Sequence, residues 1–226
     1  MANVTVCGYL RTNTGDQIPL RADSQAEGTE FTLQTDTNLT TVAQNIGNYK
    51  PGATIVSGEI FSPNGISYAY ILRQGVIMSW LSVNVAGVTN KEQMSSRPVV
   101  MRPGDTLRVL PMAAASRNFA LCVSTSSGID RIFVGTPSGS GTTNLLDLQD
   151  STSIGDTLQG TTITQAIATS VDGSKIVSSG SAWIRNASGQ LAGAVPASNP
   201  IKVEALVSMV NIPIALNFTA SVVTNA

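Results

Sequence analysis

The sequence predicts an all-β protein, and three observations support that prediction. Short runs in which apolar and polar residues alternate, such as VTVCGYL and SYAYIL, recur along the 226 residues, and a period of two is typical of strands. Clusters of turn-forming Gly, Pro, Asn and Asp separate these runs about every ten residues. Sustained helical periodicity is nearly absent. We therefore expect a jelly-roll-like antiparallel sandwich or barrel with one short helix.

The expected strands lie between turn signals that have a physical mechanism. In RPVVMRPGDTLRVLPM, Pro103-Gly104-Asp105 separates two apolar runs, because proline presets φ, glycine accepts a positive φ and aspartate bonds back to the chain. This stretch predicts a strand, a turn and a strand. The full set of expected strands is 3–11, 29–34, 53–61, 67–73, 76–85, 98–102, 106–113, 118–124, 129–134, 161–167, 174–178, 181–186, 190–195, 201–209 and 212–223.

One segment, TDTNLTTVAQNIGNYKPG, departs from the strand pattern and predicts the short helix. The polar residues 36–38 can cap its start and Gly47 can end it. Its apolar residues fall at the i, i+3, i+4 and i+7 spacing of one helix face: Leu39, Val42, Ala43 and Ile46.

The glycine-serine run GTPSGSGTT at 135–143 organises the chain into two parts. It predicts a long exposed loop or a flexible linker. Residues 1–134 would then form the main β-sandwich, and residues 144–226 either its remaining strands or a second small β-domain. A faint internal echo, CGYLRTNTGDQIPL at 7–20 and SAWIRNASGQLAGAV at 181–195, predicts two similar hairpins, which would fit either duplication or ordinary hairpin chemistry.

The composition excludes the commonest catalytic sites, because the chain has no histidine. Without imidazole it cannot build a cupin-type metal centre, a Ser-His-Asp triad or a Cys-His dyad. Only 12% of residues are charged, about half the usual share. The acids Asp147, Asp150 and Asp156 do not match an EF-hand loop, and solvation of a loop explains them. We expect no enzyme activity, no cofactor and no metal site.

The charge balance also narrows the class of partner. A net charge of −1 and a pI near 5.3 provide no basic field for nucleic acid, so we expect no direct contact with it. We find no secretory signal and no membrane-spanning run, so we expect synthesis in a cytoplasm and no membrane contact. Cys7 and Cys122 lie in apolar strand contexts and predict buried thiols, although a disulfide stays open.

Sparse charge, with a mean hydropathy of +0.16, predicts that much of the uncharged surface contacts protein. Arginine outnumbers lysine nine to four, and arginine is enriched at protein interfaces. Edges and termini can add to a neighbour's sheet, so strands 3–11 and 212–223 and the loop 135–143 are the expected contact segments. The candidate interface residues are Arg97, Arg102, Arg108, Arg117, Trp183, Thr136, Pro137, Ser138 and Phe218.

The MANVTV start, the PVVMRPGDTLRVLP strand pair and the TPSGSGTT loop lie among histidine-free, lysine-poor strands rich in Ala, Thr, Ser and Val. Together these features resemble the virion structural proteins of bacteriophages, especially β-rich capsid and head-decoration or cement proteins. The resemblance implies a jelly roll or related sandwich, located in the virion, that forms a trimer or higher homo-oligomer and binds other shell proteins. The chain lacks the basic arm of genome-packaging coat proteins, which favours an outer layer.

Two other classes of function stay open at this point. A receptor-binding or carbohydrate-binding β-domain of a phage fibre or spike would use exposed aromatic residues, of which Trp183 is the best candidate, whereas Trp80 lies among aliphatic residues and is expected in the core. Tyr68 and Tyr70 share one strand face and fit either a stacking pair or a core contact. An enzyme that works without histidine is the third class, and no residue stands out for it.

Overall fold

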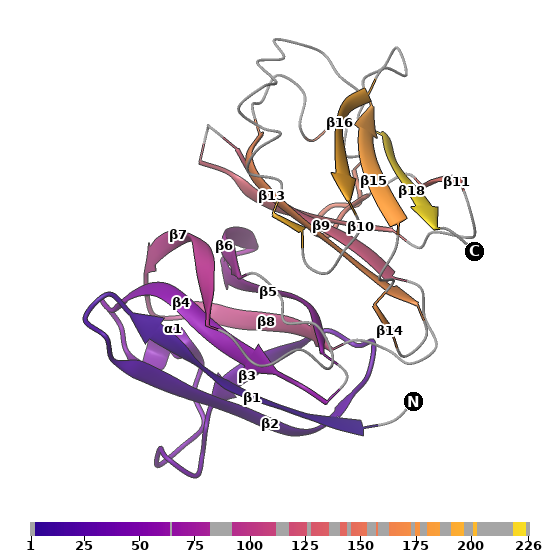
Figure 1. The fold of residues 1–226 in the computed structure, drawn as a ribbon. Coiled ribbons are helices and arrows are strands. Elements are labelled where there is room, and N and C mark those ends of the chain that lie inside the picture. Colours follow the sequence, from indigo (N-terminus) through magenta and orange to yellow (C-terminus); the bar gives the residue numbers. More distant parts are fainter. Residues whose placement is uncertain are drawn as a thin grey trace. The chain divides into compact units, whose positions relative to one another are not determined.

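Strands make up nearly all the regular structure in the computed structural model, which confirms the predicted all-β class with an antiparallel barrel and one short helix (Figure 1). The chain divides into two units, Met1–Ala114 and Ala115–Ala226, and each is described by itself. Beyond Thr157 the description covers the backbone. The structure describes residues 3–63, 65–81, 92–111, 118–125, 128–135, 141–143, 146–152, 157, 163–172, 175–176, 180–185, 191–196, 201–202 and 219–224.

The first unit is a closed barrel of eight antiparallel strands in the order β1-β2-β3-β8-β5-β6-β7-β4, and β4 returns to β1. Because the barrel is closed, every strand has a neighbour on both sides and none offers a free edge. The strands are β1 (Asn3–Thr12), β2 (Gln17–Ala26), β3 (Phe31–Thr35), β4 (Thr54–Phe61), β5 (Ile66–Arg73), β6 (Val76–Leu81), β7 (Gln93–Val100) and β8 (Thr106–Pro111).

Aliphatic side chains at alternate strand positions form the core of this barrel. Alternation turns Val6 and Leu10 of β1 into the core, where Leu10 lies opposite Ile18 of β2, and all three side chains are fully buried. Each such side chain stabilises the fold by roughly 1.5 to 3 kcal/mol relative to exposure. Trp80 is also fully buried, as predicted.

The list of expected strands omits β2, although the echo segment 7–20 predicts a hairpin that contains its first residues, and the list begins β7 too late. In QIPLRADSQA only Ile18 and Leu20 are strongly apolar, and charged residues such as Arg21 and Asp23 occupy the exposed positions. Residues 93–97 of β7 are mostly polar, but Gln93 and Met94 pair with β4 and Ser95 pairs with β6 in the barrel. Pairing on both sides, which composition does not show, makes both segments strands.

The predicted helix around Leu39 to Ile46 is wrong in position. The helix α1 (Ile46–Tyr49) begins where the predicted one ends, while Leu39 and Val42 are 72% and 60% exposed. The side-chain carboxylate of Asp36 accepts a hydrogen bond from the backbone amide of Asn38 at 2.9 Å. Such local hydrogen bonds compete with those of a helix. The segment 37–42 therefore forms turns and bends.

Gly47 lies within α1 and does not end it as predicted. An added Cβ there would lie 2.1 Å from the carbonyl oxygen of Arg102, so only glycine permits the approach of the two backbones. The amide of Gly47 donates to the carbonyl of Asp105 at 3.2 Å. α1 is thus fixed against the turn at Pro103.

The predicted turn at Pro103-Gly104 is confirmed, but the strands around it do not pair with each other. β8 pairs with β3 and β5, while β7 pairs with β4 and β6. The predicted order of strand, turn and strand is therefore confirmed, although β7 and β8 are not neighbours in the barrel. The turn carries the chain across one end of the barrel, and the buried Asp105 holds it there.

The second unit contains two open antiparallel sheets. One has the order β12-β10-β9-β13-β14 with β17 beside β13, and the other has the order β11-β18-β15-β16. The strands are β9 (Asn118–Thr125), β10 (Asp130–Gly135), β11 (Gly141–Thr143), β12 (Leu146–Asp147), β13 (Ile163–Asp172), β14 (Lys175–Ile176), β15 (Gly180–Arg185), β16 (Leu191–Pro196), β17 (Ile201–Lys202) and β18 (Thr219–Thr224).

The boundary between the units falls before β9, between Ala114 and Ala115. The sequence instead predicts a boundary at the run 135–143, with residues 118–134 in the first part. In the structure β9 pairs with β10 and β13 of the second unit, and Val123, Ile132 and Phe133 are fully buried.

The two segments of the internal echo form antiparallel hairpins, as predicted. In β1–β2, Leu10 pairs with Ile18, and in β15–β16, Ile184 pairs with Gly193. The hairpins differ in their surroundings, because β1–β2 is enclosed by β3 and β4 whereas β15–β16 lies at the end of a sheet.

Candidate interaction surfaces

The turn at Pro103 is held by a buried ion pair. Arg73, at the end of β5, donates to both carboxylate oxygens of Asp105 at 2.8 and 2.7 Å, and Asp105 is 1% exposed. The amide of Arg102 donates to the same carboxylate at 2.8 Å, and Arg73 also donates to the carbonyl of Val100 at 2.7 Å. The hydrogen bond with Asp105 raises the pKa of Arg73. These charges therefore fasten the end of the barrel.

Arg108, a predicted interface residue, belongs to a second internal network. Its guanidinium donates to Glu30 at 2.8 Å and to Thr32 at 3.1 Å. The hydroxyls of Tyr68 and Tyr70 donate to the same carboxylate at 3.1 and 2.8 Å. The two rings lie 6.0 Å apart and are almost fully buried. The network links β5 and β8 to the residue before β3, so these tyrosines make a core contact.

Burial shapes the electrostatics of this network. Desolvation raises the pKa of Tyr70, and the Glu30 carboxylate raises it further because it accepts the phenol proton in a hydrogen bond. Desolvation lowers the pKa of Arg108, but the hydrogen bond with Glu30 opposes it, and the net direction is upward. Tyr70 and Arg108 therefore stay protonated and donate their hydrogen bonds to Glu30.

A third network lies on the strands β1 and β4. Arg11 donates to Glu92 at 2.6 Å, and Ser57 donates to the same carboxylate oxygen. The Arg11 guanidinium also lies 5.6 Å from the centre of the Tyr9 ring. The hydrogen bond from Arg11 lowers the pKa of Glu92, which stays ionised as the partner of Arg11.

The structure does not bring the predicted arginines together. Arg97 lies on β7 and Arg108 on β8, and β5 and β6 separate these strands in the barrel. Arg102 is exposed at the Pro103 turn. The residues that do form clusters with them, Arg73 and Glu30, were missed, because no local pattern marks a partner that is distant in sequence.

Several predicted contact residues have no described side chain. Trp183 lies in the middle of β15, where its backbone pairs with Ala194 on one side and Ser221 on the other. The remaining candidates lie outside the described residues: Arg117, Thr136, Pro137, Ser138 and Phe218.

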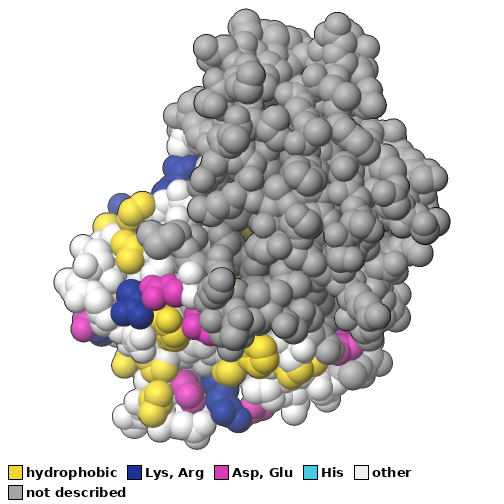
Figure 2. All heavy atoms as spheres, viewed as in Figure 1, with side chains coloured by type: hydrophobic (Ala, Val, Ile, Leu, Met, Phe, Trp, Pro, Cys, Tyr) yellow, Lys and Arg dark blue, Asp and Glu magenta, His cyan; other side chains and the backbone are white. Residues whose placement is uncertain are grey.

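Exposed aliphatic side chains of the barrel gather at one end, which we call the α1 end. It consists of the β1–β2 turn, residues 36–53 with α1, the β5–β6 turn and residues 101–105, joined by bonds such as Gly52 to Met101. In the described part of the first unit, all the strongly exposed large aliphatic residues lie there: Leu39, Val42, Val76 and Val100, at 72%, 60%, 55% and 54%. Figure 2 shows apolar side chains among acids and bases on the described face.

The free sheet edges differ from those that the sequence suggested. β1 lies between β2 and β4, and β18 lies between β11 and β15, so neither terminal strand is an edge. The prediction that these strands add to a neighbour's sheet by an open edge is therefore wrong. Among the described strands, the second sheet of the second unit ends at β11 and β16.

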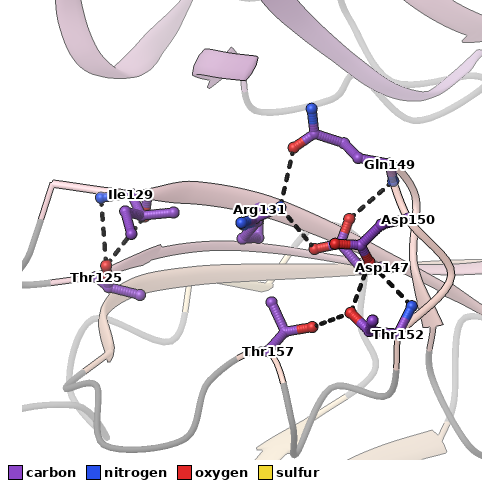
Figure 3. A network of polar contacts seen from close by, with 8 residues as sticks. All are labelled: Thr125, Ile129, Arg131, Asp147, Gln149, Asp150, Thr152 and Thr157. Atoms are coloured by element: carbon purple, nitrogen blue, oxygen red, sulfur yellow. Dashed lines mark hydrogen bonds and ion pairs between the residues drawn. The ribbon is translucent and has the colours of Figure 1, made fainter. Parts of the chain in front are cut away.

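The acids Asp147 and Asp150 organise a loop of the second unit (Figure 3). Arg131 lies 3.2 Å from a carboxylate oxygen of Asp147, and the backbone N–H of Gln149 donates to the Asp147 carboxylate at 2.8 Å. Thr152 donates to Asp150 through its amide at 2.9 Å and its hydroxyl at 2.6 Å. Both carboxylates therefore stabilise the loop.

The pKa values of these two carboxyl groups shift in opposite directions. Burial raises the pKa of Asp147 despite the opposing effects of the Gln149 amide and the Arg131 charge. The bonds from Thr152 lower the pKa of Asp150. Asp156 lies outside the described residues, and within the described part no three acids or cysteines come together in an arrangement that could hold a metal ion.

Both cysteines are free thiols and lie in different units. Cys122 is buried in β9, as predicted, whereas Cys7 is partly exposed on β1. Burial raises the pKa of each thiol, which disfavours the reactive thiolate.

No protein-family model, curated protein or solved structure matches this chain. In the residues that the structure describes, no helix has the length and apolar character needed to cross a membrane. The function is therefore argued from the surfaces themselves.

Proposed function

We propose that this protein is a non-enzymatic structural subunit of a bacteriophage virion, a capsid decoration or cement protein or a minor coat subunit. It self-associates, contacts other shell proteins and stabilises the shell. One observation carries the proposal: the ionic networks of the barrel are satisfied internally, while its exposed aliphatic residues gather at the α1 end. This distribution suits a surface that contacts protein and fits the resemblance of the sequence to β-rich virion proteins.

The mechanism depends on buried area. Each Å² of apolar surface removed from water contributes roughly 25 cal/mol, so even a modest patch adds a favourable term to association. Part of that term is lost to the entropy of association. Repetition on a lattice compensates, because a subunit held at several weak points dissociates far more slowly than one held at a single point.

The α1 end provides a direct test with a matched control. Leu39→Asp places a carboxylate where an exposed aliphatic side chain stands, and Thr41→Asp places the same charge two residues away on an exposed polar position of the same turn. We expect the wild-type chain and Thr41→Asp to associate in light scattering and in negative-stain images, and Leu39→Asp to associate more weakly.

A chain that stays monomeric at every concentration and binds no virion shell contradicts the proposal. Binding to a glycan array that is lost in Trp183→Ala would instead favour the receptor-binding or carbohydrate-binding alternative.

A further inference from the structure

Among the described strands, β16 is the last of its sheet, so its outer edge has no hydrogen-bonding partner in the described part of the chain. It pairs with β15 through Trp183 with Ala194 and Ile184 with Gly193, and no other described strand pairs with it. The outward N–H and C=O groups of such a strand can form a further ladder with an extended chain. A segment that fills the outer edge of β16 must therefore pair with it as a strand.

The similar hairpin in the first unit shows how this position is filled there. Its second strand, β2, corresponds to β16 and pairs on its outer side with β3, through Leu20 with Thr35 and Arg21 with Gln34. This outer pairing is short and β2 is bulged, since the register shifts between Val4 and Val6 of its partner β1. A bulged hairpin strand with a short outer pairing is thus a stable arrangement in this protein.

The sequence of β16 does not protect its edge with charge. β2 carries Arg21 and Asp23, whereas LAGAVP in β16 has no charged residue. Edge strands that must not pair usually carry lysine, proline or another device. β16 has two such devices, a register shift at Ala192 and the proline at 196, and they limit pairing to the regular part between them, Gly193 to Val195.

This short regular segment is complementary to itself. When two copies lie antiparallel about a two-fold axis through Ala194, each Ala194 faces its counterpart and each Gly193 faces Val195 of the other copy. A small residue thus stands opposite a larger one at both outer positions. The bulge and the proline on either side disfavour other registers.

We propose that two copies of this chain join through β16, antiparallel and centred on Ala194, so that their sheets become continuous. The inference rests on the self-association stated under "Proposed function" and specifies one contact through which it occurs. A single pairing this short is weak, and therefore reversible in solution. A trimer or larger assembly requires a second contact, for which the α1 end is available.

Cysteine scanning along β16 tests both the contact and its register. In a full-length background with Cys7→Ser and Cys122→Ala, Ala194→Cys places two thiols opposite each other across the axis, within reach of a disulfide. Gly193→Cys and Val195→Cys are matched controls, because each faces the other position and not itself. We expect mild oxidation to give a covalent dimer for Ala194→Cys alone, and for an equal mixture of Gly193→Cys and Val195→Cys chains.

Every outcome of this experiment decides the proposal. Equal cross-linking of all three variants, or none, on a non-reducing gel overturns it, provided that circular dichroism shows each variant folded. Charged substitutions at the same position provide an independent test. Ala194→Lys chains alone should associate about two- to fivefold more weakly than the wild type, because two like charges face each other. Mixing them with Ala194→Glu chains should restore association.

The outcomes also separate this inference from the proposed function. If the wild-type chain associates in light scattering while the cysteine and charge variants show no dependence on position, the contact at β16 is wrong and self-association stands. If the wild-type chain does not associate at any concentration, the contact at β16 is wrong, and the proposed function is wrong as well if the chain also binds no virion shell.

Discussion

The two hairpins β1–β2 and β15–β16 share a sequence pattern but have different neighbours. In the first unit, β3 and β4 enclose the hairpin in a closed barrel, and in the second unit β18 covers one side and β16 is the last of the described strands. A similar local sequence therefore lies inside a closed barrel in one place and, among the described strands, at the edge of a sheet in the other. Closure of the sheet, which depends on distant segments, decides which edge stays available to another molecule.

Three contacts of the barrel hold its neighbouring segments together. Gly8 permits the close approach of β1 to β4, Asp105 fixes the turn across one end, and Glu30 ties two tyrosines to Arg108. If these contacts keep the barrel closed, substitutions at them should lower its free energy of unfolding.

Gly8→Ala should produce the largest loss of stability, because it opens the seam between β1 and β4. Gly8 has a φ of +152°, and an added Cβ would lie 1.9 Å from the carbonyl oxygen of Glu59. We expect a loss of about 3 kcal/mol or more in the free energy of unfolding, measured by chemical denaturation.

Gly15→Ala is the matched control for this seam. Gly15 also has a positive φ, +88°, but an added Cβ there would meet nothing within 4 Å. It should cost only about 1 kcal/mol, which is the backbone strain alone. Equal losses in the two variants would show that the approach of β4 is unimportant.

Asp105→Ala should have the second largest effect. It leaves the guanidinium of Arg73, which is only 17% exposed, without its carboxylate and frees the amide of Arg102. Loss of one partner of a buried pair destabilises the folded state, here by about 2 to 3 kcal/mol. Asp23→Ala removes the exposed pair with Arg21 and should leave the denaturation midpoint unchanged.

Tyr70→Phe should have a smaller effect, because it removes one hydrogen bond and keeps the ring. Its hydroxyl donates to Glu30 at 2.8 Å in a nearly buried position. The expected loss is about 1 kcal/mol in the free energy of unfolding. Tyr49→Phe is the control, since the hydroxyl of Tyr49 has no hydrogen-bond partner among the described residues, and it should change nothing.

Asp147→Asn should change the pH dependence of stability in the second unit. Burial raises the pKa of Asp147 in the folded state, so the unfolded chain releases this proton at a lower pH than the folded one. The contribution of this group to stability is therefore highest below the unfolded pKa and falls as the pH rises through the folded pKa. Chemical denaturation at several acidic pH values should show that the free energy of unfolding declines less with rising pH in the asparagine variant than in the wild type. An equal decline in both would contradict this role of Asp147.

The sequence predicted what depends on local pattern. Alternation identified most strands, Pro103-Gly104 predicted its turn, and the echo predicted two hairpins. The failures have two causes. β2 and the start of β7 lack strong apolar character and are strands because they pair with distant segments, whereas the predicted helix is replaced by a turn that local hydrogen bonds of Asp36 hold. Glu30 could not be identified as the centre of a network, because its partners on β5 and β8 are remote in sequence.

Hydrogen–deuterium exchange of the full-length chain at low and high protein concentration tests the contrast between the closed barrel and the open edge most directly. If copies join through β16, peptides covering 191–196 gain protection as the concentration rises, while β1, β2 and the other barrel strands keep the same protection. Protection that rises in the barrel strands while β16 stays unchanged would contradict the account.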